Sequence, residues 1–356
     1  MADLRDKRVD LILQQLEELP TLPAVAARVL AVTSDGDSSA ADVVRLIESD
    51  PALSARILQL TRRSDRGVRD DATTVGRAVV LLGFDAVRNA VLAVSVFQAL
   101  GPSDGGGGAG DRGGAGHGNG PAGGNRRVGR EELWKHCLAV ACCAELLAEQ
   151  LPGGGHGGGG ATPSDAFLCG LLHDLGKIAL DVALPKSYAR VVEAADLLRG
   201  DIADLERTVI GVDHQVAGKR LAERWQLPPA VRDAAWLHNT APEALPAGVR
   251  AGVVNLVTLA DYVVRRQHLG YSGNHAFPVG RDALLAATGL SAAAVDKAAA
   301  ELVDRMKPRL SALGIGDQSG DDLYRQAIAR ADQELRRVAG QLGRAGGRRP
   351  ADTPRA

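Results

Sequence analysis

Aromatic residues are scarce in this chain: Phe, Trp and Tyr make up 3% of its 356 residues. A core with few aromatic rings must be filled by Leu, Val, Ala and Ile, and cores rich in Ala and Leu favour helices over sheets. The formal net charge of -1 at pH 7 does not point to nucleic acid or an anionic membrane as the main partner. We therefore expect an all-α protein with neither nucleic acid nor membrane among its partners.

Cysteines are few, and long hydrophobic runs are missing. The four cysteines are Cys137, Cys142, Cys143 and Cys169. No two of them form a CxxC pair, so a zinc knuckle is not expected, and those in predicted helices are interpreted as small buried thiols. The apolar stretch from Ala78 to Phe84 is interrupted at Asp85, too early to span a bilayer. The first ten residues carry charges of both signs and lack the apolar segment of a secretory signal. Together these features predict a cytoplasmic protein.

Two glycine-rich segments divide the chain. Residues 101–129 consist mainly of Gly with Ser, Asp, Asn and Pro, and such a segment buries too little apolar area to offset its ordering entropy. It is predicted to be a flexible linker. Residues 153–160 form a second, shorter Gly run that is predicted to be an expanded loop between two helices. The tail after Gly343 is rich in Arg, Gly and Pro and is expected to be disordered.

Helix signals recur along the first hundred residues. Asp50 followed by proline is a strong start signal, with Asp as the N-cap and Pro at the first helical position. Thr74 is predicted to cap a helix over Val75–Leu82 that stops at Gly83. Asp85 is predicted to cap the helix that follows. Short helices separated by brief breaks indicate a compact bundle.

The second half has the same character, with strand signals nearly absent. The predicted helices are Glu131–Gln150, one that starts at Ser164 or Asp165, Asp213–Trp225, Pro228–Leu237, Val253–Arg265, and Asp322 to about Leu342. The last of these is amphipathic by spacings of three and four. It would pack onto its own bundle or form a dimer seam, and the first alternative is slightly preferred.

The residues that could carry chemistry lie in the second half, beginning with the segment Gly170–Lys177. Here His173 and Asp174 stand side by side near a predicted helix end, where an imidazole and a carboxylate can both reach one metal ion. Gly176 lets the backbone leave the helix. Lys177 would supply a cation for an anionic group such as phosphate.

Four further polar residues stand in otherwise apolar helices: His136, His214, His238 and Asp261. A charged Asp261 is costly to bury unless a metal or a basic partner accompanies it. Each of these residues also has a simpler interpretation, because a single buried His is most often a hydrogen-bonded core residue. Their order along the chain favours a joint site. His268 and His275 follow the last strong helix and are interpreted as surface residues.

Several motifs in order resemble the HDOD branch of the HD superfamily of metal-dependent phosphohydrolases. The N-terminal motifs are Leu19-Pro20-Thr21-Leu22-Pro23, Ile47–Leu53 and Ala78–Gly83, and the C-terminal ones are Trp134-Lys135-His136, Phe167–Lys177, Leu221–Pro228 and Ala235–His238. The match covers roughly residues 15 to 270 apart from the glycine-rich inserts, and several separate motifs in order make it specific. It implies a multi-helix HD-type bundle with an N-terminal helical subdomain.

Composition, periodicity and the resemblance together divide the chain. The resemblance implies the N-terminal helical part at 1–100 and the HD-like helical part at 130–275, and composition and periodicity predict the linker at 101–129, C-terminal helices at 276–345 and a disordered tail at 346–356.

The same resemblance implies a ligand set for a divalent metal ion such as Mn, Fe, Zn or Mg. His136, His173, Asp174 and Asp261 match the H…HD…D pattern of the superfamily. His214 and His238 match the additional histidines of the HD-GYP branch. The candidate metal ligands are therefore His136, His173, Asp174, His214, His238 and Asp261, and the catalytic candidates are Asp174 and Lys177. Lys177 is expected at the cavity mouth and the two additional histidines at the cavity edge.

Two departures bear on activity. HDOD domains commonly carry a His pair where this chain has His238 and Asn239, and the Gly-Tyr-Pro motif of the HD-GYP branch does not occur. The resemblance therefore implies first a signal-transduction module that acts through protein–protein interaction with a signalling partner, as a monomer or a homodimer. The alternative is a metal-dependent phosphohydrolase in which the metal activates water.

Overall fold

The structure is a computed structural model, and the expectation of an all-α fold is confirmed. It describes residues 2–34, 40–50, 53–55, 57–58, 74–100, 130–152, 161–313 and 315, and these contain no strand. The helices of the first hundred residues are α1 (Ala2–Glu17), α2 (Ala24–Ser34), α3 (Ala40–Glu48), α5 (Val75–Leu82) and α6 (Phe84–Leu100). The others are α7 (Arg130–Glu149), α8 (Pro163–Leu172), α9 (Leu175–Ala183), α10 (Pro185–Leu198), α11 (Ile202–Val209), α12 (His214–Arg224), α13 (Pro229–Leu237), the 3-10 helix η2 (Pro242–Ala244), α14 (Ala251–Arg266), α15 (Arg281–Thr288) and α16 (Ala292–Leu313).

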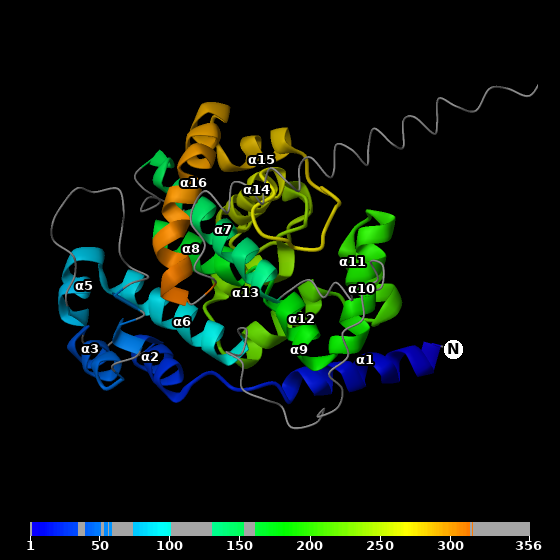
Figure 1. Ribbon diagram of the computed structural model, residues 1–356, viewed down its shortest axis with the longest axis horizontal. Coiled ribbons are helices and arrows are strands. Elements are labelled where there is room, and N and C mark those ends of the chain that lie inside the picture. Colours follow the sequence, from blue (N-terminus) through cyan, green and yellow to red (C-terminus); the bar gives the residue numbers. More distant parts are fainter. Residues whose placement is uncertain are drawn as a thin grey trace, which may run out of the picture.

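Helix α7 lies at the centre of the bundle and is buried along most of its length. Helices α8, α14 and α16 pack around it, while α9, α12 and α13 form the neighbouring layer (Figure 1). Helix α6 packs on α8, and α1 lies against α9 and α12, so the N-terminal helices contact the second half in two places. One hydrophobic core runs through both halves. This packing brings residues that are far apart in sequence to the break between α8 and α9.

The predicted caps of the N-terminal helices are largely confirmed. Asp50 Oδ1 accepts a hydrogen bond from the Leu53 backbone nitrogen at 3.0 Å. Thr74 caps α5 by accepting from the Arg77 nitrogen, and Gly83 ends it with φ of 89°. The predicted cap at Asp85 is wrong, because α6 begins one residue earlier and Asp85 lies in its first turn. There its carboxylate still complements the helix dipole.

The boundaries of the later helices agree with prediction to within one or two residues. Helix α8 starts earlier than predicted because Thr162, and not Ser164 or Asp165, is its N-cap: Thr162 accepts from the Asp165 nitrogen, and proline follows at the first helical position. Asp213 caps α12 by accepting from the Val216 nitrogen. The predicted helix at 322–342 and the linker at 101–129 lie outside the described residues.

Helix α16 lies within 276–345, where C-terminal helices were expected, although its own bounds were not predicted, and it completes the bundle. It docks on α7 through buried charges: Arg309 forms two hydrogen bonds with Glu145, at 2.7 and 3.0 Å, and Arg305 bonds both Glu145 and Glu149. The Arg309 guanidinium also lies over the Phe167 ring, 4.6 Å from its centroid. Its bounds could not be predicted from apolar periodicity, because its inward face is partly charged.

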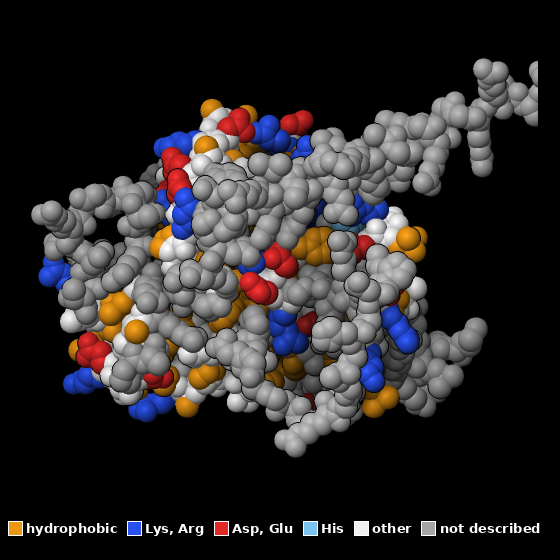
Figure 2. Space-filling view, viewed as in Figure 1, with side chains coloured by type: hydrophobic (Ala, Val, Ile, Leu, Met, Phe, Trp, Pro, Cys, Tyr) orange, Lys and Arg blue, Asp and Glu red, His pale blue; other side chains and the backbone are white. Residues whose placement is uncertain are grey.

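On the face seen in Figure 2, the coloured acidic and basic side chains are interspersed among apolar ones. Among the described helices, none is by itself long and apolar enough to cross a membrane. Helices α15 and α16 pass the length and composition test only as a pair bent by 102°.

Candidate metal centre

The structure brings the six predicted ligand residues together at the middle of the second half. His136 comes from α7, His173 and Asp174 from the break between α8 and α9, His214 from the first residue of α12, His238 from the residue after α13, and Asp261 from α14. All six are buried, and Asp261, the most exposed, is 5% exposed. The expectation that His214 and His238 lie at the edge of a cavity is therefore wrong, since they are 0% and 1% exposed.

Close backbone contacts hold these helices at fixed spacing. A Cβ on Gly170 would lie 2.8 Å from the Ala141 Cα, so α8 rests directly on α7. A Cβ on Gly176 would lie 1.8 Å from the His214 carbonyl oxygen, which places α9 against the start of α12. Only glycine permits such an approach. The two glycines that flank the His-Asp pair therefore set where its side chains point.

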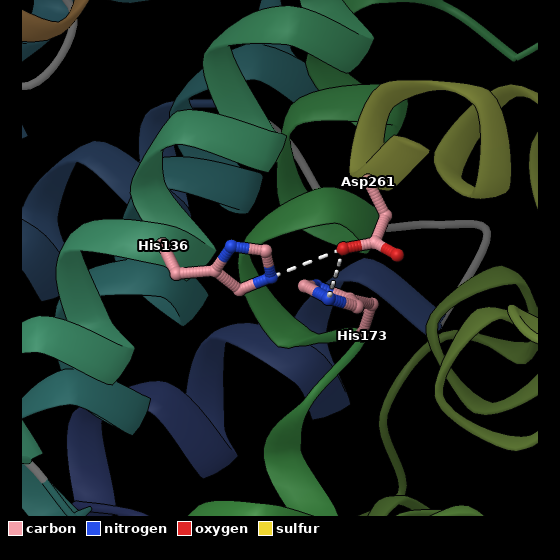
Figure 3. Close-up of side chains that lie close together, drawn as sticks. All are labelled: His136, His173 and Asp261. Carbon is pink, nitrogen blue, oxygen red and sulfur yellow. Dashed lines mark ion pairs between the residues drawn. The ribbon is translucent and has the colours of Figure 1, made fainter. Parts of the chain in front are cut away.

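The first group of converging ligands is His136, His173 and Asp261. One ligand atom from each lies within 4.8 Å of the others. Asp261 Oδ1 is 3.1 Å from His136 Nε2 and 3.9 Å from His173 Nε2, as the dashed lines of Figure 3 mark. Figure 3 shows the three side chains entering the same space from different helices. Two imidazoles and a carboxylate are a donor set suited to a divalent transition metal.

Asp174 joins this group to a second one, Asp174 with His214 and His238. Its Oδ2 is 3.3 Å from His173 Nε2 and 3.8 Å from His136 Nε2. Its Oδ1 faces the other way, 3.4 Å from His238 Nε2 and 3.9 Å from His214 Nε2. Asp174 is thus placed between two groups of imidazoles, one at each carboxylate oxygen.

The histidines are oriented by hydrogen bonds from their other ring nitrogen. His173 Nδ1 donates to the Gly170 carbonyl at 2.7 Å, and His238 Nδ1 donates to the Ala234 carbonyl at 3.1 Å. A carbonyl can only accept, so both Nε2 atoms carry the lone pair when the ring is neutral. This arrangement is typical of metal-bound histidine.

Glu206 orients His214 in the same way and was not predicted. Its Oε2 accepts from both the backbone nitrogen and Nδ1 of His214, at 2.7 and 2.6 Å, and Tyr188 donates to Oε1. Glu206 is fully buried in α11. It stands eight residues before His214 in a helix that the sequence did not reveal, so no local motif could have identified it.

The two carboxylates of the centre already have cationic neighbours. Lys177 Nζ lies 2.9 Å from Asp174 Oδ2 and 3.1 Å from the Ser272 carbonyl, and Arg265 lies 3.2 Å from Asp261 Oδ2. Lys177 is 2% exposed, so its predicted place at a cavity mouth is wrong. It lies inside because the attraction between its ammonium group and the nearby Asp174 carboxylate is stronger when both are removed from water.

Burial and charge act in opposite directions on these groups. Burial lowers the pKa of His136, and it lowers that of His238 to about 4. For His173 burial acts the same way, but the neighbouring Asp174 carboxylate outweighs it and the pKa is raised. Burial alone would raise the pKa of Asp174, yet His173 and Lys177 hold it well below its ordinary value. Asp174 is therefore ionised at neutral pH and suited to bind a cation.

Asn239 stands where a second histidine was expected from the resemblance. Its Nδ2 lies 3.1 Å from His238 Nε2 and 3.4 Å from His214 Nε2. An amide nitrogen can donate to imidazole lone pairs, so Asn239 partly satisfies the second group. The first group has no such donor, and His136 Nε2 is buried without a hydrogen-bond partner. Asp174 Oδ1 is likewise buried and unpartnered.

These observations test whether a divalent ion suits the centre. Buried polar atoms normally have partners. His136 Nε2 belongs to the first group and Asp174 Oδ1 faces the second, and a cation in either group would give one of these atoms a partner. The donor set of imidazole and carboxylate also suits Mn, Fe or Zn better than Mg. The residues therefore fit a divalent metal ion, and they fit it best at His136, His173, Asp174 and Asp261.

A small cavity lies beside this centre. It has a volume of about 20 Å³ and is lined by Arg130, Asp181, Tyr188 and Ser272 with three apolar residues. That volume is enough for a water molecule. Arg130 and Asp181 pair across it at 2.9 Å and are about 30% exposed. The cavity therefore reaches from the surface to the residues that contact Lys177 and Glu206.

The interpretation of His275 as a surface residue is wrong in detail. Its side chain is 17% exposed and contacts Asp196, Tyr271 and Arg199. These residues hold the loop that carries Ser272. His268 has a positive φ of 56° and is half-buried.

Comparison with known proteins decides the family. The model of the HDOD domain matches residues 19–109 and 120–241, more than half of the chain. The chain belongs to the HDOD family. A crystal structure of an HDOD domain protein of unknown function from Geobacter sulfurreducens aligns with a TM-score of 0.62 and 24% identity, covering 85% of this chain and 99% of that one.

Two other solved structures share the HDOD fold. A candidate phosphohydrolase from Shewanella amazonensis SB2B aligns with a TM-score of 0.58 and 23% identity, covering 88% of this chain and 97% of that one. A candidate signal transduction protein from Marinobacter aquaeolei VT8 aligns with a TM-score of 0.63 and 21% identity, covering 88% of this chain and 66% of that one. An uncharacterised protein of Treponema pallidum (strain Nichols) is 24% identical over 254 residues, and the match spans 44% of its length. At these identities the structural matches establish the fold.

Proposed function

We propose that this HDOD chain is a signal-transduction module that acts by contact with a partner protein, and that one divalent metal ion ties its helices together. The ion would be held by His136, His173, Asp174 and Asp261. The observation that carries the proposal is burial: every ligand is at most 5% exposed. Structural metal sites are closed in this way, whereas catalytic sites keep a coordination position open to water or substrate.

The balance of charge supports a single ion. The carboxylates of Asp174, Asp261 and Glu206 face the cations of Lys177 and Arg265, which leaves one net negative charge when the imidazoles are neutral. One divalent ion changes this to one net positive charge, and a second ion would add two more. Buried net charge is costly, so the centre favours one ion.

In this proposal the residues of the chain have distinct tasks. Asp174 carries the negative charge at the α8–α9 break, and Lys177 compensates that charge. The Gly170 carbonyl fixes the tautomer of His173 and thereby keeps its Nε2 free to bind. When bound, the ion supplies a cross-link between α7, α8 and α14 and would lower the pKa of any water that reached it.

A metal-dependent phosphohydrolase is the second candidate, and two observations favour it. Asp174 lies between two imidazole groups, an arrangement that suits two metal ions. The cavity at Arg130 and Tyr188 has room for water beside residues that contact Lys177 and Glu206. Some of the similar structures carry phosphohydrolase names, which for this chain is an argument from fold alone.

One experiment separates the two candidates. Purified full-length wild type and the variant Asp174→Asn are analysed for Mn, Fe and Zn and assayed with a generic phosphodiester in the presence of each metal. Asp233→Asn is the matched control, because Asp233 is equally buried but contacts Arg232 and the Arg250 backbone instead of the centre. We expect about one ion per chain in wild type and control, almost none in Asp174→Asn, and no hydrolysis. Hydrolysis that is lost in Asp174→Asn would refute the signalling proposal and support the phosphohydrolase.

A further inference from the structure

A thiol lies within the candidate metal centre and belongs to neither group described above. Cys137 follows His136 on α7 and is fully buried. One ligand atom each from Cys137, His173 and Asp174 lie within 4.8 Å of one another. We propose that the Cys137 sulfur is an additional ligand of the ion, which selects Zn²⁺ or Fe²⁺ over Mg²⁺ and Mn²⁺. This inference rests on the proposed metal centre.

The atoms around Cys137 supply independent support. His136 Nε2 and Asp174 Oδ1 are buried without hydrogen-bond partners, and both residues adjoin the thiol, one in sequence and one in space. A bound cation would supply the partner that buried polar atoms normally have. The cysteine group shares His173 with the first imidazole group and Asp174 with the second, so an ion bound at the His173-Asp174 pair has the sulfur among its nearest donor atoms.

The other cysteines have different surroundings. Cys142 Sγ accepts from Arg309 at 3.4 Å and so belongs to the contact between α7 and α16. Among the residues that the structure describes, neither Cys143 nor Cys169 belongs to a group that could hold an ion. Cys169 lies on α8, and the charges that act on it are those of Asp165, Arg250 and Asp233, outside the centre. Cys169 is therefore a matched control thiol.

The charge of the centre gives a reason for a thiolate. With one divalent ion, the carboxylates and cations listed above leave one net positive charge. A Cys137 thiolate cancels it, and a buried site without net charge avoids the cost of desolvating an unpaired ion. A coordinating thiol loses its proton to the metal outright. Thiolate is a soft ligand, and it favours Zn²⁺ and Fe²⁺ where oxygen ligands favour Mg²⁺ and Mn²⁺.

Spectroscopy of the metal-loaded full-length chain tests the inference. The chelator-treated protein is titrated with Co²⁺, whose visible d–d bands report any bound ion and whose near-ultraviolet charge-transfer band reports a thiolate ligand. We expect both bands in wild type and in Cys169→Ser. In Cys137→Ser we expect the d–d bands alone, with Co²⁺ affinity weaker by about tenfold or more, the lower end of what losing a supporting partner costs.

The outcomes distinguish the two proposals. Co²⁺ uptake with no charge-transfer band in wild type, or a band that survives in Cys137→Ser, overturns the role of Cys137 and leaves the metal centre standing. No uptake by wild type overturns both. If Cys137→Ser does not fold, X-ray absorption of the zinc-loaded wild type decides without a variant. A sulfur neighbour at about 2.3 Å supports the inference, and a shell of only nitrogen and oxygen at about 2.0–2.2 Å refutes it.

Discussion

In the buried charge cluster between α7 and α16, we expect the loss of the acidic partner and the loss of the basic partner to lower stability by different amounts. Glu145 bonds both Arg305 and Arg309, whereas Arg305 has a second carboxylate in Glu149. Both Glu145 and Arg309 are 4% exposed. Burial works against the charge of Arg309, but the carboxylate of Glu145 raises its pKa above the ordinary value. Arginine is not deprotonated in proteins, so the guanidinium stays charged when Glu145 is removed.

Removing the two partners should have different costs. Glu145→Ala takes the two-oxygen partner away from a buried guanidinium, and breaking a buried pair in this way costs about 3–5 kcal/mol. Arg309→Met removes the charge itself, fills much of the same space, and leaves Glu145 paired with Arg305. We expect it to cost about 1–2 kcal/mol, within the usual range for a single substitution. The double variant should be more stable than Glu145→Ala alone.

Urea unfolding of the full-length chain, followed by far-ultraviolet circular dichroism, measures these differences. Arg281→Ala is the control, because Arg281 pairs with Asp296 at the surface, where ion pairs contribute about 0–1 kcal/mol. The reasoning is refuted if Arg309→Met is as damaging as Glu145→Ala, or if the double variant is the least stable of the three. Either result would mean that packing, and not the uncompensated charge, dominates the contact.

Three further predictions concern the centre. Gly176→Ala should destabilise the chain by about 3 kcal/mol or more, since the new Cβ meets the His214 carbonyl at 1.8 Å, whereas Gly200→Ala, with nothing within 4 Å, should change the thermal midpoint little. In the metal-free protein, the pKa of His238 is about 4 when folded and near 6.5 when unfolded, so the unfolded state binds more protons between these values. The unfolding free energy should therefore fall from pH 6.5 to 4.5, by at most about 3 kcal/mol, and His238→Gln should flatten the dependence; an unchanged slope would contradict the assigned pKa. Chelation should lower the thermal midpoint of wild type and leave that of Asp174→Asn unchanged, and equal responses would exclude a metal at Asp174.

Much of the fold was accessible from sequence because its signals are local. Asp50, Thr74 and Asp213 each bond a backbone nitrogen two or three residues ahead, and that kind of cap can be recognised without knowing the rest of the molecule. The same holds for the His173-Asp174 pair at a helix break. The bounds of α16 and its docking on α7 were not predicted, because its buried face includes arginines whose partners are about 160 residues away, and periodicity of apolar residues does not reveal such a face.

The residues that make up the centre were predicted more accurately than the positions of their side chains. The six candidate ligands converge, but Lys177 points inward to Asp174, and Glu206 supports His214 from a helix that gave no signal. Both outcomes depend on desolvation. A lysine or glutamate is expected at the surface until the folded structure shows a buried partner at hydrogen-bond distance, and that partner is fixed by tertiary packing alone.

The glycine contacts beside the ligands imply that architecture and chemistry can change independently in this bundle. Gly170 and Gly176 fix the distances between α7, α8, α9 and α12 through backbone atoms, without using the ligand side chains. A substitution such as Asn239 for a histidine therefore alters what the interior can bind while the helices keep their places. Related chains could therefore differ in what their interior binds and still present the same outer surface to other molecules.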